Sequence, residues 1–167
     1  MNTNRKKIEY ISYSAIIAAL YVALSWISNI LGLASYAVQL RLSEALCALT
    51  FFTPSAIPGM FIGCIISNLT MSAQPIDVIF GSLATLIGAY LGSKIKNKYL
   101  VPLPTVVANA IVVPFVVLFC YTNGVKNLSS YLVIFATVTI GEVLSAYVLG
   151  IILLVAIDKR KIFKGKK

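Results

Sequence analysis

The stretch that decides the fold is VQLRLSEALCALTFFTPSAIPG, from Val38 to Gly59. It opens with the polar residues Gln39, Arg41 and Glu44, and then becomes almost wholly apolar up to Pro54. About twelve apolar residues reach only about 18 Å as an α-helix, which is short of the roughly 30 Å hydrocarbon core of a membrane. The stretch therefore either spans the membrane alone, with its polar residues as an outer turn, or joins the next apolar segment in a helix broken at the prolines.

The whole composition is that of a polytopic membrane protein. Of the 167 residues, 59% are hydrophobic and only 11% are charged, and the mean hydropathy is +0.93. An ordinary soluble domain is about 25% charged. The length suits one domain of roughly six spans of about 20 residues each, and each span must be helical to satisfy its own backbone hydrogen bonds. The first apolar run is too long for the core of a signal peptide and no clear small-residue cleavage site follows it, so we expect it to stay in the mature protein.

We therefore predict an all-α integral membrane protein, a bundle of six transmembrane helices in a single transmembrane domain over residues 1–167. The predicted spans are about 8–33, 42–53, 55–71, 75–93, 102–121 and 130–157.

Basic residues set the orientation of these spans. Twelve of the fourteen lysines and arginines lie in three clusters, at 5–7, 94–98 and 159–167. Six spans place all three clusters on one side, which is cytoplasmic by the positive-inside rule, whereas merging the second and third spans would split them. The charges thus favour six spans with cytoplasmic N and C termini. The net charge of +9 then reflects orientation, and we expect no nucleic-acid partner.

Few polar groups lie inside the spans, and they lie mostly towards the outer side. Glu142 is near the middle of the sixth span, and Asn109 reaches a similar depth in the fifth. A charge at mid-bilayer costs between about 2.5 and more than 10 kcal/mol, so it needs a partner or a wet cavity. The sequence predicts a solute-capture cavity open to the outside, with these two residues at its floor. The other candidates for its wall are Gln39, Arg41, Glu44, Asn68 and Asp77.

Each candidate also has a structural alternative. Arg41 and Glu44 stand three residues apart and can pair on one helix face. Asp77 lies in the first turn of a helix, where a carboxylate favours the helix dipole. Asn68 and Asn109 can join helices to each other. Both roles, solute contact and helix packing, stay open for these residues.

Several function classes are disfavoured. The chain has no histidine, and its three cysteines, Cys47, Cys64 and Cys120, form no CxxC pair, so we expect no metal and no other cofactor. It has no Walker motif, so ATP-driven work needs a partner. We see no cluster of catalytic groups and expect no enzyme activity. A carrier that works alone, with Glu142 as its proton site, stays an alternative.

Two features resemble a known family. In SAIIAALYVALS, Ala15, Ala19 and Ala23 recur every four residues and form a smooth face that another helix can approach closely. Other spans show this spacing, so it is unspecific alone. QLRLSEAL followed by FFTPSAIPGMFIGCIISNL is more specific, and with the alanine face it resembles the QueT family of S components of energy-coupling factor (ECF) transporters.

This resemblance implies a substrate-binding subunit for the uptake of queuosine precursors. Such a subunit would capture a 7-deazaguanine, such as the 7-cyano or 7-aminomethyl form, from outside the cell. It would associate with a transmembrane coupling subunit and two cytoplasmic ATPase subunits. By the same resemblance, Ala15, Ala19 and Ala23 would dock on the coupling subunit, and the connection that contains Tyr36 would cover the cavity.

The chemistry of a 7-deazaguanine suits the polar candidates. Its N–H and NH₂ donors on one edge match a carboxylate, for which Glu142 is the first choice and Glu44 and Asp77 the next. Its carbonyl needs a donor, from Asn109, Asn68 or Gln39, and its flat ring suits an aromatic face such as Trp26 or Tyr36. An S component for another vitamin or base is the nearest alternative.

Overall fold

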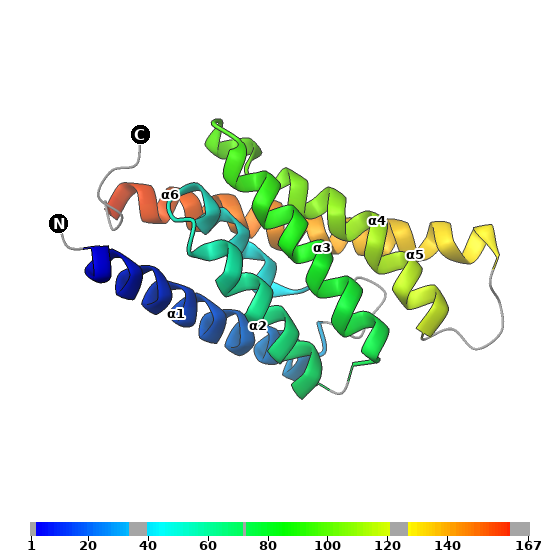
Figure 1. The fold of residues 1–167 in the computed structure, drawn as a ribbon. Helices are drawn as coiled ribbons and strands as arrows, with labels where there is room; N and C mark the ends of the chain where they lie inside the picture. Colours follow the sequence, from blue (N-terminus) through cyan, green and yellow to red (C-terminus); the bar gives the residue numbers. More distant parts are fainter. Residues whose placement is uncertain (1–2, 34–39, 72, 121–126, 161–167) are drawn as a thin grey trace.

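The structure, a computed structural model, describes residues 3–33, 40–71, 73–120 and 127–160, and within them it is helical without any strand. The all-α prediction is therefore confirmed. In chain order the elements are α1 (Thr3–Ile30), the 3₁₀ helix η1 (Leu42–Phe51), α2 (Ala56–Thr70), α3 (Pro75–Lys94), the short 3₁₀ helix η2 (Lys98–Leu100), α4 (Leu103–Cys120), α5 (Leu128–Glu142), the π-helix η3 (Val143–Leu149) and α6 (Gly150–Arg160) (Figure 1).

Four helical segments in the described part of the chain are long and apolar enough to cross a membrane. They are α1, α3, the segment Lys98–Cys120 that ends with α4, and the continuous helix Leu128–Arg160 that α5, η3 and α6 form together. Two shorter apolar helices, η1 and α2, lie between the first and second of these in the sequence. Long apolar helices of this kind are what a multi-pass membrane protein requires.

The described basic residues lie mostly at one end of the helix bundle. The beginning of α1 and the end of α6 lie at the same end of the bundle as the turn between α3 and α4 (Figure 1). At that end Lys98 Nζ lies 2.8 Å from Asp158 Oδ2, which joins the α3–α4 turn to the end of α6. The described basic residues around 94–98 and at the ends of α1 and α6 therefore share one end, as the positive-inside rule requires.

The second predicted span forms the centre of the bundle as a 3₁₀ helix. A 3₁₀ helix rises about 2.0 Å per residue, so the ten residues of η1 reach about 20 Å, further than an α-helix of the same length. Residues 43–50 of η1 are all buried, and η1 packs against α1, α2, α3, α6 and η3 (cyan in Figure 1). Such long 3₁₀ runs are uncommon. Packing on all sides thus selects a helix type that the sequence does not reveal.

The last predicted span contains a π-helix that directly follows Glu142. The seven residues of η3 continue the path of α5 into α6, and they pack against η1. Cys47 of η1 donates a hydrogen bond from Sγ to the carbonyl of Ala146 in η3, at 3.6 Å. π-Helical turns inside α-helices occur frequently at functional sites. The sequence predicts one uninterrupted span here, and the structure places a wider turn next to the buried acid.

Glycines allow α1 and α2 to approach each other closely. A Cβ atom added at Gly63 would lie 2.7 Å from Tyr21 Cβ and 2.9 Å from the carbonyl oxygen of Ala18. One turn earlier, a Cβ at Gly59 would lie 2.8 Å from the carbonyl oxygen of Ser14. The two glycines thus bring the helix backbones into direct contact, which is the packing expected of small residues four apart. This contact buries Tyr21 completely.

Candidate functional site

The structure gathers five of the predicted binding residues in the interior of the bundle, together with one tyrosine. We call this group the polar cluster; it consists of Tyr21 from α1, Arg41 and Glu44 from the start of η1, Asn68 from α2, Asn109 from α4 and Glu142 from the end of α5. Arg41 is half-buried, and the other five are at most 3% exposed. Five separate elements therefore position one polar group in a largely apolar core.

Glu44 has two carboxyl oxygens in unequal surroundings. The hydroxyl of Tyr21 donates a hydrogen bond to Oε1. The side chains of Thr85 and Asn109 lie close to the carboxyl group. Oε2 is nevertheless buried without a hydrogen-bond partner among the described residues. One oxygen is therefore fixed, and the other can accept a further donor.

Glu142 and Asn109 lie next to each other, as their equal predicted depth suggests. The Asn109 side chain interacts with the carboxyl groups of both Glu142 and Glu44, and these two acids are close enough for their charges to interact. Glu142 Oε2 and Asn109 Oδ1 are also buried without a partner among the described residues. Buried polar atoms are normally paired, and leaving one unpaired costs about 1–3 kcal/mol. Three acceptor atoms of this cluster are thus ready to receive hydrogen-bond donors.

Arg41 joins the start of η1 to α2 and α3. Its Nη2 donates a hydrogen bond to Asn68 Oδ1 at 2.6 Å, and its charge interacts with those of Asp77 and Glu44. Asp77 Oδ1 and Asn68 Nδ2 lie 3.1 Å and 3.5 Å from the point where Gly81 would carry a Cβ, so both side chains border this glycine. Arg41 and Glu44 form no ion pair at contact distance, although the structure describes both. The pair of Arg41 with Glu44, one of its two predicted alternatives, is thus not formed, and Arg41 bonds instead to Asn68, whose predicted helix-joining role is present.

The charges of the cluster are unbalanced. The cluster itself holds the carboxyl groups of Glu44 and Glu142 against the single cation of Arg41, and Asp77, whose charge also interacts with Arg41, adds a third carboxyl group beside it. An opposite charge or several hydrogen-bond donors would stabilise this arrangement. Among the described residues, no three His, Cys, Asp or Glu side chains gather as metal ligands would. The cluster therefore has more hydrogen-bond acceptors and carboxyl groups than the cation and donors that the described residues supply.

Other predicted residues lie elsewhere. Trp26, on α1, is 40% exposed, and its Nε1 donates to Thr70 Oγ1 at 3.2 Å, so it bridges α1 and α2. Ala15, Ala19 and Ala23 are all exposed on α1, where a neighbouring protein can reach them. Gln39 and Tyr36, with the predicted cover of the cavity, lie outside the described residues.

Sequence reasoning missed three members of the surroundings: Tyr21, Thr85 and Cys64. Cys64 Sγ accepts hydrogen bonds from Asn68 Nδ2 and Thr85 Oγ1, each at 3.6 Å. The available signal was the position of Tyr21, which lies in the middle of a span, whereas tyrosines of membrane proteins concentrate at the two interfaces. A hydroxyl at that depth needs a partner in the core, and Glu44 provides it.

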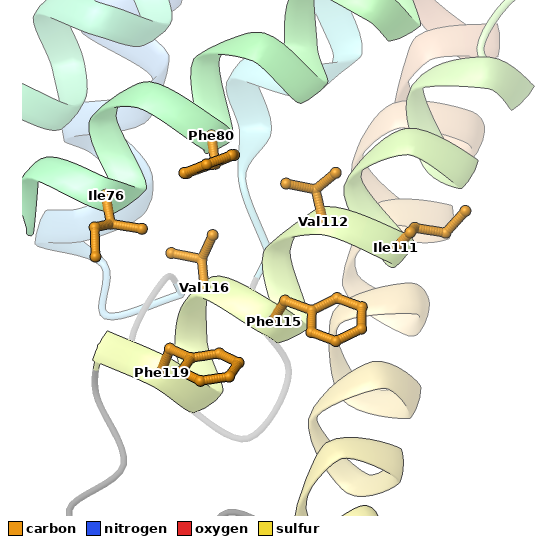
Figure 2. A pocket seen from close by; sticks show the side chains of 7 residues that line it. All are labelled: Ile76, Phe80, Ile111, Val112, Phe115, Val116 and Phe119. Carbon is orange, nitrogen blue, oxygen red and sulfur yellow. The ribbon is translucent and has the colours of Figure 1, made fainter.

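Two pockets lie away from the polar cluster. Figure 2 shows an apolar pocket of about 360 Å³ between α3 and α4, lined by Ile76, Phe80, Ile111, Val112, Phe115, Val116 and Phe119. Another, of about 270 Å³, lies at the basic end of the bundle beside Lys94 and Phe52. Neither includes Glu142 or Asn109. The outward-open cavity above Glu142 stays a prediction.

Comparison with known proteins agrees with the resemblance found in the sequence. A family model described as QueT transporter matches residues 11–159. A protein of Lactococcus lactis subsp. cremoris (strain MG1363), named queuosine precursor transporter QueT, is 38% identical over 85 residues, which are 51% of this chain and 50% of the relative. The match thus spans about half the length of that curated relative. No solved structure matches this chain.

Proposed function

Because this chain belongs to the QueT transporter family, whose members are multi-pass proteins of the bacterial plasma membrane, we propose that it captures a queuosine precursor outside the cell for uptake. One observation carries this proposal beyond the family match. Three buried acceptor atoms, on Glu44, Glu142 and Asn109, have no hydrogen-bond partner among the described residues of this apolar bundle. Such atoms are costly unless a donor reaches them, and a 7-deazaguanine has donors on one edge.

The polar cluster supplies what this ring needs. Glu142 would accept hydrogen bonds from the N–H and NH₂ edge, and the amide of Asn109 would meet the neighbouring carbonyl. Glu44 Oε2 offers a second acceptor in the same region. The apolar surroundings exclude water and strengthen each of these bonds.

The excess of acids over bases favours one form of the solute. A 7-aminomethyl group is cationic, and a second carboxylate would stabilise it, whereas a 7-cyano group is neutral. Asp77 lies near Arg41 at the outer part of the cluster, where it would add to the negative field. We therefore expect the aminomethyl form to be preferred.

The chain would act as the S component of an ECF transporter, with no catalytic activity of its own. Its sequence has no nucleotide-binding motif, so ATP hydrolysis would come from two cytoplasmic ATPase subunits through a transmembrane coupling subunit. The exposed alanines 15, 19 and 23 of α1 support docking of that coupling subunit, because small side chains allow a second helix to approach.

Calorimetry on the purified protein in detergent tests the binding site. We expect the 7-aminomethyl compound to bind with nanomolar to low micromolar affinity. Glu142→Gln, which keeps the shape but removes the charge, should weaken binding about 10- to 100-fold, the value of one or two hydrogen bonds to a charged group. Asp158→Asn is the matched control, because Asp158 is an exposed acid near the end of the same long helix, far from the polar cluster. Unchanged affinity in Glu142→Gln would remove Glu142 as the anchor.

Transport in liposomes tests the subunit assignment. Uptake should require ATP, the coupling subunit and both ATPase subunits. Uptake by this chain alone under a pH gradient would instead identify a proton-coupled carrier. Tight binding of a different vitamin or base, with none of a 7-deazaguanine, would keep the subunit assignment and replace the solute.

A further inference from the structure

One face of α1 is joined to the start of η1 by a ladder of three hydrogen bonds. Tyr21 O–H donates to Glu44 Oε1, Ser25 Oγ–H donates to Ser43 Oγ at 2.8 Å, and the backbone N–H of Leu42 donates to Ser28 Oγ at 2.9 Å. Positions 25 and 28 follow position 21 by four and seven residues, so all three lie on one face of the helix. Their partners are three consecutive residues of η1, taken in reverse order, as antiparallel elements require.

The ladder is shielded from solvent and lipid. Tyr21, Ser43 and Glu44 are 0% exposed, and Ser25 and Ser28 are 4% and 1% exposed. A hydrogen bond in such surroundings is strong, and the loss of one partner leaves the other buried and unsatisfied. The ladder therefore fixes the beginning of η1 against α1.

The rung at Tyr21 differs from the other two because it ends on a member of the polar cluster. Tyr21 occupies Oε1 of Glu44 and thereby fixes the rotation of the carboxyl group, whereas Oε2 of the same group has no partner among the described residues. Asn109, which connects Glu44 to Glu142, lies close to this carboxyl group. The orientation of the open oxygen is thus determined from α1.

We propose that Tyr21 is a positioning residue for the solute site. Its hydroxyl holds Glu44 so that Oε2 accepts a hydrogen bond from the solute, and Tyr21 itself makes no contact with the solute. This inference rests on the proposed function, because it assumes that Glu44 takes part in binding. It adds a residue that acts only through Glu44.

A double-mutant cycle measured by calorimetry with the 7-aminomethyl compound tests this role. Tyr21→Phe removes only the hydroxyl, and we expect it to weaken binding about 10-fold. In a Glu44→Leu background the same substitution should change the affinity little, because leucine has no oxygen for the Tyr21 hydroxyl to hold. If Tyr21→Phe weakens binding equally with and without Glu44→Leu, the two residues act independently and the inference is wrong.

Ser25→Ala is the matched control for a purely structural role. It removes the neighbouring buried rung without touching Glu44, so it should lower the melting temperature while leaving the affinity near that of the wild type. Equal losses of affinity in Ser25→Ala and Tyr21→Phe would assign the effect to packing of α1 and overturn the inference.

The wild type separates this inference from the proposed function. If the wild type binds no 7-deazaguanine, the proposed function fails and this inference fails with it. If the wild type binds, Glu142→Gln weakens binding and Tyr21→Phe binds like the wild type, only the role of Tyr21 is wrong.

Discussion

Gly63→Ala gives a direct test of the contact between α1 and α2. The added Cβ would lie 2.7 Å from Tyr21 Cβ and 2.9 Å from the carbonyl oxygen of Ala18. Carbon atoms in contact normally stand about 3.5–4.0 Å apart, so the overlap with Tyr21 is roughly 1 Å. Neither atom is at the end of a flexible side chain, and the two helices must therefore move apart.

The size of the effect follows from a matched substitution. Overpacking of a close contact costs about 1–3 kcal/mol, while replacing glycine by alanine inside a helix gains about 0.5–1 kcal/mol. A Cβ added at Gly150 would have the carbonyl oxygen of Ala45 as its nearest neighbour, at 3.4 Å, which is an ordinary contact. Gly150→Ala should therefore gain the same free energy from helix propensity without a steric overlap of its Cβ atom. The difference between the two variants isolates the overpacking cost.

Thermal unfolding in detergent, followed by circular dichroism, measures this difference. For a chain of this size, 1 kcal/mol shifts the melting temperature by about 2–4 °C. We expect Gly63→Ala to melt about 2–12 °C below Gly150→Ala. If Gly63→Ala melts at the same temperature as Gly150→Ala or above it, the close approach of α1 and α2 at this glycine is wrong.

Three further predictions concern charge, access and selectivity. Asp158→Asn should lower the free energy of unfolding by less than about 1 kcal/mol, because its pair with Lys98 is partly exposed, and a larger loss in chemical unfolding would contradict this. A maleimide should label Cys120 before the buried Cys47 and Cys64, which should react only after unfolding; equal rates by mass spectrometry would contradict their burial. In competition calorimetry the 7-aminomethyl compound should displace the 7-cyano compound, and equal affinities would show that the excess of acids does not select a cation.

The approach of Asn109 to Glu142 could be predicted from the sequence because depth along a span can be counted. Glu44, which the sequence places at the outer side, lies in the structure close to both of them, and that was not predicted. Each residue of an α-helix adds about 1.5 Å, so polar residues at similar distances from the ends of antiparallel spans lie at similar levels. A charge in an apolar span also demands a partner or a polar cavity, which directs the search to other polar residues at that level. These two rules account for the residues that the prediction and the structure share.

Rotation about the helix axis could not be predicted in the same way. In a soluble helix the apolar face shows which side is buried, but a membrane helix is apolar on the side facing lipid as well as the side facing the core. The sequence therefore does not show that Trp26 contacts Thr70 on α2. For the same reason it does not show that Tyr21 faces Glu44.

The helix types of η1 and η3 also could not be predicted. Both segments consist of residues that form α-helices elsewhere, and the choice of a narrow or a wide turn depends on the space that the neighbouring elements leave. The helices α1, α2, α3, α6 and η3 surround η1 and limit the space for its turns. Because these helices come from the whole length of the chain, this limit exists only in the folded protein.

The narrow central helix has a mechanical consequence. If the ten residues of η1 rewound from about 2.0 Å to about 1.5 Å per residue, the element would shorten by roughly 5 Å, which is a full helical pitch. Glu44 lies in the first turn of η1 and Phe51 is its last residue. The contraction would therefore bring the acid and the aromatic ring closer to each other. A change between the two helix types would therefore move residues at the centre of the protein along the helix axis, without rotation at a hinge.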